Sequence, residues 1–291
     1  MRDQDSLHRF LIEGSNIRGE LVHLDESWKA LLAKNAYPEP VRALLGEALA
    51  AVALLGATLK IDGSIILQVR GEGPVTLLVA QAQSDHTVRG LARHNDAVPS
   101  DRPLTELFGT SRLVITIDAG QGGEPYQGIV PLAGERLAEA LQGYFDQSEQ
   151  LPTKLWLTSS ERSAAGLLLQ DLPGEQLDPD AWDRTTLLAD TLTEQELLDL
   201  PAPTLLRRLY NQEWVRLFES QPVSFRCSCS AERCRGMLLA LGEPEVRTIL
   251  DEQGEVSINC EFCNSRYRFD AVDIEQLFRD GATPSVPPTR H

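Results

Sequence analysis

Four of the five cysteines in this chain lie in two close pairs near its C-terminal end. The first pair is Cys227-Ser-Cys229, and the second, about thirty residues later, is Cys260-Glu-Phe-Cys263. If a loop brings the two pairs together, they can hold one zinc ion as four thiolates, or they can close into two disulfides. These states exclude each other, because a sulfur in a disulfide is no longer a thiolate. The cysteines therefore predict a metal site, a redox switch, or both.

The spacing favours zinc. Zinc prefers a tetrahedral arrangement of thiolates at about 2.3 Å, and two ligand pairs on separate turns give this geometry without strain. No histidine lies between residues 95 and 290, so four cysteines must supply the ligands. In a reducing compartment, paired cysteines bind metal or do redox chemistry more often than they form structural disulfides. We predict one zinc ion on Cys227, Cys229, Cys260 and Cys263.

The fifth cysteine, Cys234, lies five residues beyond the first pair, with four residues between it and Cys229. It could replace one member of that pair in a C-x4-C arrangement. The shorter spacing of Cys227 and Cys229 makes a spare, uncoordinated thiol the better interpretation of Cys234.

A zinc site of this kind can respond to oxidants. Zinc keeps the sulfurs as thiolates, which are the nucleophilic form. Peroxide or hypochlorous acid converts a thiolate to a sulfenic acid, and a neighbouring thiol resolves it to a disulfide. Loss of the metal removes about 10 kcal/mol or more of folding free energy from a small zinc module. The spacing alone also fits an inert structural zinc ribbon, so both interpretations stay open at this point.

Other chemistries have weak signals. No G-x-S-x-G or H-E-x-x-H motif occurs, and His8, His23, His86 and His94 are scattered, so we predict no catalytic residues. The Gly71-Glu-Gly73 and Asp118–Glu124 stretches lack the Lys-Ser/Thr of a phosphate-binding loop and are interpreted as turns. A thioredoxin-like role for the second cysteine pair lacks the βαβ pattern that would support it.

Composition limits the classes of partner. The chain has 291 residues, a mass of 32.1 kDa and a net charge of −16, which argues against nucleic acid. Residues 227–280 hold 6 Arg and no Lys against 11 Asp and Glu, the reverse of a DNA-binding zinc module. The N-terminus lacks the apolar region of a signal peptide, and no run approaches the roughly 20 apolar residues that span a bilayer. We expect a soluble, cytoplasmic protein.

Residues 1–177 predict an N-terminal α+β core with an antiparallel sheet. Residues 10–23 resemble one strand with glycine bends, and 41–60 are typical of a buried core helix. The remaining pattern predicts a helix at 134–145 and strands elsewhere. These strands fall within 63–93, 112–118, 126–130, 153–158 and 165–170.

Residues 178–226 differ in character and predict a metastable helical linker. The stretch from 178 to 200 has seven acids against one Arg, with apolar residues at helical spacing. Thr193-Glu-Gln-Glu196 fits a capping box, and Pro201 and Pro203 end that helix. Helices this short depend on tertiary packing for stability. Residues 227–280 are expected to form the zinc-binding module, and 281–291 are expected to be a disordered tail.

The cysteine module resembles that of a known family. Phe225-Arg-Cys227-Ser-Cys229-Ser-Ala-Glu-Arg-Cys234, with Cys260-Glu-Phe-Cys263 and Tyr267-Arg-Phe-Asp270, is similar to the redox-regulated heat shock protein 33 chaperones. Tyr126-Gln-Gly-Ile-Val130 and Tyr144-Phe-Asp-Gln-Ser-Glu-Gln-Leu-Pro152 resemble that family in the N-terminal half. The likeness covers nearly the whole chain apart from the tail, and all four ligand positions match.

The resemblance implies an ATP-independent holdase chaperone and no enzyme. Its reduced form would carry zinc and be inactive. Oxidation would form the disulfides Cys227–Cys229 and Cys260–Cys263, release zinc, unfold the linker and favour homodimers. The partners would be unfolding client proteins, and the N-terminal core would provide the client-binding platform. Two alternatives are a zinc-ribbon adaptor module on an α+β domain and a thiol-disulfide oxidoreductase using Cys260 and Cys263.

Overall fold

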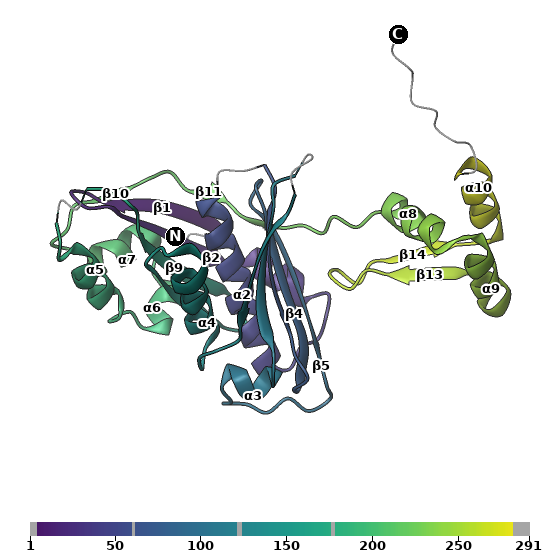
Figure 1. Cartoon of the computed structure of the whole chain (residues 1–291), viewed down its shortest axis with the longest axis horizontal. Coiled ribbons are helices and arrows are strands. Elements are labelled where there is room, and N and C mark those ends of the chain that lie inside the picture. The colour runs from purple at the N-terminus through teal and green to yellow at the C-terminus, as the bar shows by residue number, and fades with distance from the viewer. Residues whose placement is uncertain (1–4, 60–61, 121–123, 176–177, 282–291) are drawn as a thin grey trace, which may run out of the picture. The chain divides into compact units, whose positions relative to one another are not determined.

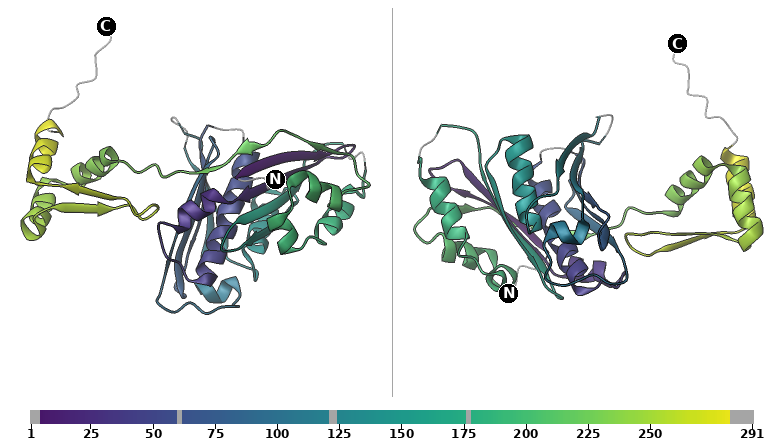
Figure 2. Two further views of the ribbon diagram at one scale, coloured as in Figure 1. Left: turned by 180° about the vertical axis from the view of Figure 1, so that it is seen from behind. Right: turned by 60° about the horizontal axis from the view of Figure 1, so that its bottom comes forward.

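The structure is a computed structural model, and it describes residues 5–59, 62–120, 124–175 and 178–281. The chain divides into two units, Met1–Arg226 and Cys227–His291, which Figures 1 and 2 show from three sides. The mixed arrangement of helices and antiparallel strands confirms the predicted α+β class. The predicted tail lies outside the described residues, except that Gly281 ends a helix.

The first unit contains two six-stranded sheets with a helix between them (Figure 1). The first sheet has the order β10-β1-β2-β9-β8, with β11 also paired to β1, and every pairing in it is antiparallel. Its strands are β1 (Ser6–Ile12), β2 (Ile17–Leu24), β8 (Thr153–Ser159), β9 (Ala164–Asp171), β10 (Val215–Leu217) and β11 (Gln221–Pro222).

The second sheet has the order β12-β5-β4-β3-β6-β7. Only the two-residue β12 runs parallel to its neighbour; the other pairs are antiparallel. Its strands are β3 (Ser64–Arg70), β4 (Val75–Gln83), β5 (Thr87–His94), β6 (Arg112–Asp118), β7 (Tyr126–Pro131) and β12 (Ser224–Phe225). The strands predicted between residues 63 and 170 are thus confirmed.

Helix α2 (Glu39–Thr58) forms the centre of the larger core, as predicted for residues 41–60. Most of its side chains are buried because apolar residues surround its circumference and both sheets pack on it. The expectation that no segment is apolar enough to span a membrane is wrong for this helix. By length and composition it passes that test, but 72% of the apolar stretch is buried in the protein core.

Three shorter helices also belong to the part of the core that the structure describes. They are α1 (Glu26–Leu32), α3 (Leu104–Phe108) and α4 (Leu137–Tyr144), and a π-helical turn (Phe145–Glu149) extends α4. Helix α4 falls within the predicted range 134–145.

One prediction about the N-terminal segment was wrong. Residues 10–23 are not a single strand: β1 and β2 form an antiparallel hairpin. The turn uses Gly14 at φ +76°, a backbone conformation that glycine adopts without a steric cost, and the Ser15 hydroxyl donates to the Ile12 carbonyl at 2.8 Å. The glycine therefore marks a reversal of the chain and not a bend in one strand.

Residues 178–226 contain three short helices followed by three short strands. The helices are α5 (Ala181–Ala189), α6 (Glu194–Asp199) and α7 (Ala202–Leu209). The capping box is present, because Thr193 accepts from the Glu196 amide while the Glu196 carboxylate accepts from the Thr193 amide. The sequence did not predict that this segment also supplies β10, β11 and β12 to the two sheets.

The three helices cover the face of the first sheet that is turned away from α2. This face and the helices form a second buried cluster, separate from the α2 core. The sheet contributes Phe10, Ile12, Ile17, Leu21, Ala165, Leu167 and Leu169, and the helices contribute Ala181, Ala189, Leu197, Ala202, Leu205, Leu206 and Leu209. The apolar spacing of the segment thus packs it onto the core, which is what short amphipathic helices need.

The second unit is a small module with its own core. It contains α8 (Ala231–Leu241), α9 (Glu243–Gln253), the hairpin β13 (Val256–Asn259) and β14 (Arg266–Phe269), and α10 (Ala271–Gly281). Among the described residues, its buried apolar cluster is small: Cys234, Leu238, Val246, Val256, Phe269 and Ile274. A core of this size supplies little folding free energy, so the module needs a further source of stability.

Candidate metal centre

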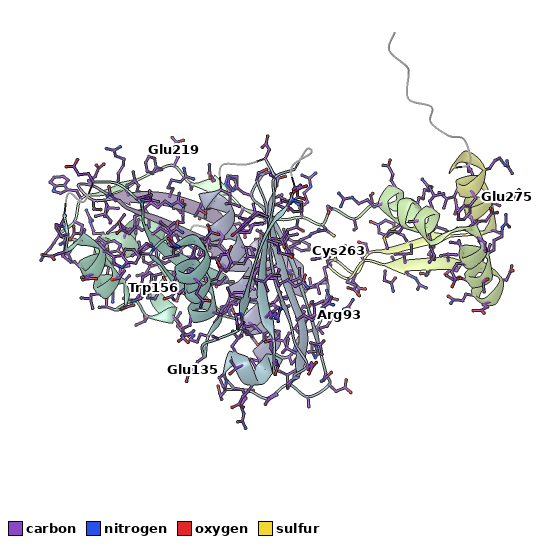
Figure 3. All side chains as sticks on the ribbon, in the orientation of Figure 1. Arg93, Glu135, Trp156, Glu219, Cys263 and Glu275 are labelled. Atoms are coloured by element: carbon purple, nitrogen blue, oxygen red, sulfur yellow. The ribbon has the colours of Figure 1, made fainter. Side chains whose placement is uncertain are left out.

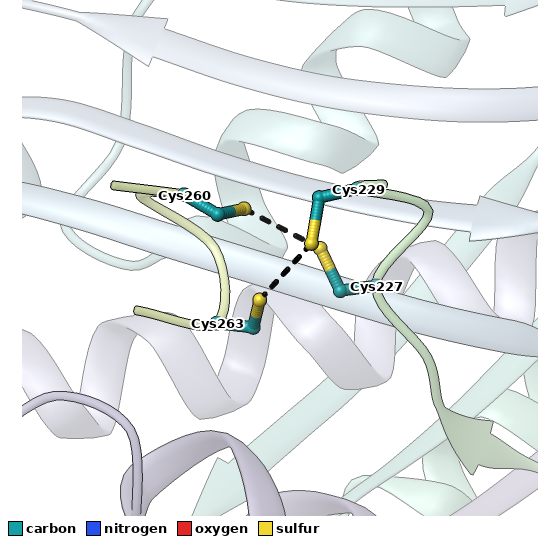
Figure 4. A group of neighbouring side chains, drawn as sticks. All are labelled: Cys227, Cys229, Cys260 and Cys263. Carbon is teal, nitrogen blue, oxygen red and sulfur yellow. Dashed lines mark hydrogen bonds between the residues drawn. The ribbon is translucent and has the colours of Figure 1, made fainter. Parts of the chain in front are cut away.

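The two cysteine pairs meet in the second unit. Figure 4 shows the four sulfurs facing one another, and all of them lie within 4.8 Å. The Sγ atoms of Cys227 and Cys260 are 3.5 Å apart, and those of Cys229 and Cys263 are 3.3 Å apart. A tetrahedron with 2.3 Å metal–sulfur bonds has sulfurs about 3.8 Å apart, whereas a disulfide needs about 2.05 Å. The cysteines are free thiols in an arrangement that fits a tetrahedral metal ion.

The first cysteine pair lies directly before the N-terminal end of helix α8. Cys227 and Cys229 lie on the extended stretch before α8, and the Ser230 hydroxyl caps that helix by accepting from the Arg233 amide at 3.2 Å. An N-terminal helix end next to Cys229 favours negative charge on sulfur.

The second pair occupies the turn between β13 and β14. The Cys260 amide donates to the Ser265 carbonyl at 2.9 Å, and the Asn264 amide donates to the Cys260 carbonyl at 2.7 Å. Asn264 adopts φ +55°, in the left-handed region that asparagine tolerates. These bonds fold the turn so that both sulfurs point the same way.

Without a metal the cluster disfavours four thiolates. Burial raises the pKa of Cys227 to about 12 and also raises that of Cys229. For Cys263, burial acts in the same direction, but hydrogen bonds with the hydroxyl and backbone of Ser265 outweigh it and bring the pKa to about 7. Four thiolates this close repel one another, so a bound cation has to neutralise them. The donor set therefore fits a thiophilic divalent ion.

Tyr267 contacts the cluster from β14. Its hydroxyl donates a hydrogen bond to Cys229 Sγ at 3.1 Å. The sequence motif contains this tyrosine, but its spacing gave no sign of the contact, which depends on the pairing of β13 with β14.

Cys234 lies apart from the four-sulfur group. It is buried in the module core on α8, next to Leu238, and burial raises its thiol pKa. Its position in the apolar core agrees with the interpretation of a spare thiol.

Two other features singled out in the sequence make structural contacts. His23 is buried, with Nε2 2.8 Å from the Leu197 carbonyl oxygen, and is a hydrogen-bonded core histidine. Gly71 and Gly73 lie in the turn between β3 and β4, where the amides of Glu72 and Gly73 donate to the Phe108 carbonyl at 2.9 Å. Those amides bind backbone, as expected for a turn. Part of the other glycine stretch, residues 121–123, lies outside the described residues.

Comparison with known proteins identifies the family to which this chain belongs. The model of the Hsp33 protein family matches residues 5–270. The chain belongs to the Hsp33 family. A 33 kDa chaperonin of Nitrosococcus oceani is 54% identical over 291 residues, and one of Pseudomonas aeruginosa is 49% identical over 298 residues, with both chains fully covered in each case.

A solved structure agrees in fold. The crystal structure of a 33 kDa chaperonin from Thermotoga maritima superposes with a TM-score of 0.83 at 23% identity, covering 95% of this chain and 99% of that one. The resemblance inferred from the cysteine motif is confirmed: the chain belongs to a chaperone family. The chain itself carries a cluster of four cysteines that could hold a metal ion.

Proposed function

We propose that this chain is an ATP-independent holdase of the cytoplasm that oxidation switches on. In the reduced state Cys227, Cys229, Cys260 and Cys263 hold one zinc ion, and the protein does not bind clients. Oxidation forms two disulfides, releases the metal and frees residues 178–226 from the core. The exposed surface then binds unfolding proteins and prevents their aggregation, and the opened chains form homodimers.

The observation that carries this proposal is the covered apolar face of the first sheet. Phe10, Ile12, Leu21 and Leu167 are at most 1% exposed because α5, α6 and α7 lie on them. Removing those helices would uncover a contiguous apolar surface, which is the feature that recognises unfolded chains. Unfolding of α5, α6 and α7 would therefore expose the surface of the first sheet that we propose binds clients.

The chain connects this cover directly to the cysteines. The segment ends in β11 and β12, each of two residues, and β12 ends at Phe225, two residues before Cys227. Such short strands contribute few hydrogen bonds and separate readily. When the module unfolds, the chain that follows β12 becomes free to move. We then expect the short strands β11 and β12 to separate from the sheets first.

The cysteines supply the redox step. Zinc, when bound, keeps the four sulfurs as thiolates. One thiolate attacks peroxide, giving a sulfenic acid and hydroxide, and its partner thiolate then displaces a second hydroxide to form the S–S bond. Each cysteine pair therefore loses two electrons, and the two hydroxides take up two protons from solvent, so one peroxide becomes two water molecules. Because disulfide sulfurs are poor ligands, the module loses its metal and with it most of its folding free energy.

We propose the pairs Cys227–Cys229 and Cys260–Cys263 on entropic grounds. The 3.5 and 3.3 Å contacts in the folded cluster run between the pairs, so proximity there does not select the partners. Once the module loosens, closing a loop of one or two intervening residues costs less entropy than closing one of about thirty. Local pairing follows from that difference.

The test compares one preparation before and after peroxide at mildly elevated temperature. We expect one zinc per reduced chain and no suppression of client aggregation, measured by light scattering. After oxidation we expect no zinc, a fall in free thiols from five to one, and suppression without ATP. Oxidised, zinc-free protein that suppresses aggregation no better than the reduced form would refute the switch. Retained zinc after oxidation would favour the inert ribbon instead.

A further inference from the structure

The helices that cover the first sheet are held by a polar contact at its edge. Asp190, at the C-terminal end of α5, places both carboxylate oxygens on side chains of the edge strand β8. Its Oδ2 accepts from Lys154 Nζ at 2.6 Å, and its Oδ1 accepts from Trp156 Nε1 at 3.1 Å. Lys154 and Trp156 are two residues apart on one strand and so project from the same face of the sheet; Figure 3 labels Trp156.

The two side chains that donate to Asp190, Lys154 and Trp156, also contact each other. Lys154 Nζ lies 5.5 Å from the centre of the Trp156 ring, within the range of a cation–π contact. An isolated exposed ion pair contributes little because holding two flexible side chains costs entropy. Here the Asp190 carboxylate accepts hydrogen bonds from two side chains of the same strand. Less side-chain entropy is therefore lost for each hydrogen bond that forms.

The position of Asp190 has a cost for its own helix. A carboxylate at the C-terminal end of a helix meets the negative end of the helix dipole, and the last turn of α5 has no basic residue to offset it. Local helix stability therefore favours a neutral side chain at position 190. The contact with β8 is the compensating interaction that the structure shows.

The neighbouring contacts lie in the same short stretch. Arg136, before α4, donates to Glu194 at the start of α6 at 3.0 Å, and His23 on β2 contacts the Leu197 carbonyl. Residues 190–197, which run from the end of α5 into α6, thus carry polar contacts to three parts of the core. Of the three residues that make these contacts, Asp190 accepts hydrogen bonds from two side chains of the core.

We propose that Asp190 is an autoinhibitory lock that keeps α5, α6 and α7 on the sheet in the reduced protein. The lock acts separately from the four cysteines, so its strength sets how readily the segment opens while the metal stays bound. This inference rests on the proposed function for its consequence, client binding, but the contact itself can be tested without it.

The experiment uses the full-length, reduced and zinc-loaded Asp190→Asn protein. We expect its zinc content to equal that of the wild type, because the cysteine module is unchanged. Amide hydrogen exchange in residues 181–199 should become about ten-fold faster, which corresponds to about 1.4 kcal/mol. Aggregation of a thermally unfolding client should be suppressed without oxidant.

Asp183→Asn is the matched control. Asp183 is exposed on the same helix, and its substitution removes the same charge. Among the described residues its carboxylate makes no hydrogen bond or ion pair that would tie it to the core, but it lies in the first turn of α5, where its charge favours the helix dipole. Client binding should therefore stay at the wild-type value, and exchange should rise by less than in Asp190→Asn.

Two further variants keep the test decisive. Lys154→Met and Trp156→Phe should each speed exchange, and combining Lys154→Met with Asp190→Asn should add little to either alone, since one interaction is lost in both. Wild-type exchange in the Asp190 and Lys154 variants, or slower exchange in Asp190→Asn as helix-dipole relief alone predicts, would overturn the lock. If wild-type protein fails to respond to peroxide while Asp190→Asn still exchanges faster, the proposed switch fails and the lock stands.

Discussion

The hydroxyl of Tyr267 donates a hydrogen bond to the Sγ of Cys229 at 3.1 Å, linking the β13–β14 hairpin to the other cysteine pair. A neutral donor on a thiolate disperses its negative charge and reduces its reactivity toward electrophiles. The contact should therefore strengthen metal retention and slow the oxidation of Cys229.

The first prediction concerns that contact. Tyr267→Phe removes only the hydroxyl, so we expect about ten-fold weaker zinc binding in competition with a chelator. Loss of thiols under limiting peroxide should also be faster. Tyr126→Phe, at an exposed tyrosine in the first unit, is the control and should match the wild type. Equal zinc affinity in the Tyr267 variant would show that the hydroxyl does not tune the site.

The second prediction separates the cysteines by position. Cys263→Ser removes one of the four clustered sulfurs, so the reduced protein should lose zinc and residues 178–226 should become sensitive to protease. Cys234→Ala lies in the module core and should keep one zinc per chain, with a modest loss of stability of about 1 kcal/mol. Metal analysis and limited proteolysis measure both. Zinc loss in the Cys234 variant would place that thiol among the ligands.

The third prediction concerns the covering helices. Leu206→Ala on α7 opens a cavity in the contact with the sheet and should weaken it by about 2–5 kcal/mol. We expect the reduced variant to bind an apolar fluorescent dye and to suppress client aggregation partially. Leu187→Ala is the matched control, because Leu187 on α5 is 66% exposed. Dye binding that is the same in both variants would argue against a client surface beneath these helices.

The fourth prediction is a pH dependence. Glu20 on β2 is fully buried, and burial raises its pKa to about 7 despite the nearby Arg9 guanidinium, which donates to Oε1 at 3.1 Å. Its Oε2 has no hydrogen-bond partner among the described residues. The folded state thus binds this proton more tightly than the unfolded state, whose pKa is about 4.5. The stability this proton contributes is complete below about pH 4.5 and is lost as the pH rises toward 7.

Glu20→Gln tests this assignment by mimicking the protonated form. The gain in unfolding free energy over the wild type should be small near pH 4.5 and approach about 3 kcal/mol at pH 8, measured by urea unfolding. Other titrating groups cancel because both proteins share them. A difference that does not change between these pH values would exclude Glu20 as the source.

The sequence by itself identified the parts of this protein whose signal is local. Tight cysteine spacing, the apolar circumference of 41–60, the alternating strands of 63–170 and the Thr193–Glu196 capping box all depend on residues close in the chain. The family motif is local as well. These patterns were enough to predict the α+β class and the four cysteines that the structure brings together.

Tertiary structure decided what those parts contact. Periodicity indicated that 178–200 is amphipathic but not that its apolar side lies on Phe10, Leu21 and Leu167, which are far away in sequence. It could not predict the short strands β10–β12, because two or three residues carry no period and form only where a sheet edge is available. The contacts of Tyr267 with Cys229 and of Asp190 with Lys154 arise in the same way: each depends on chain segments that only folding brings together.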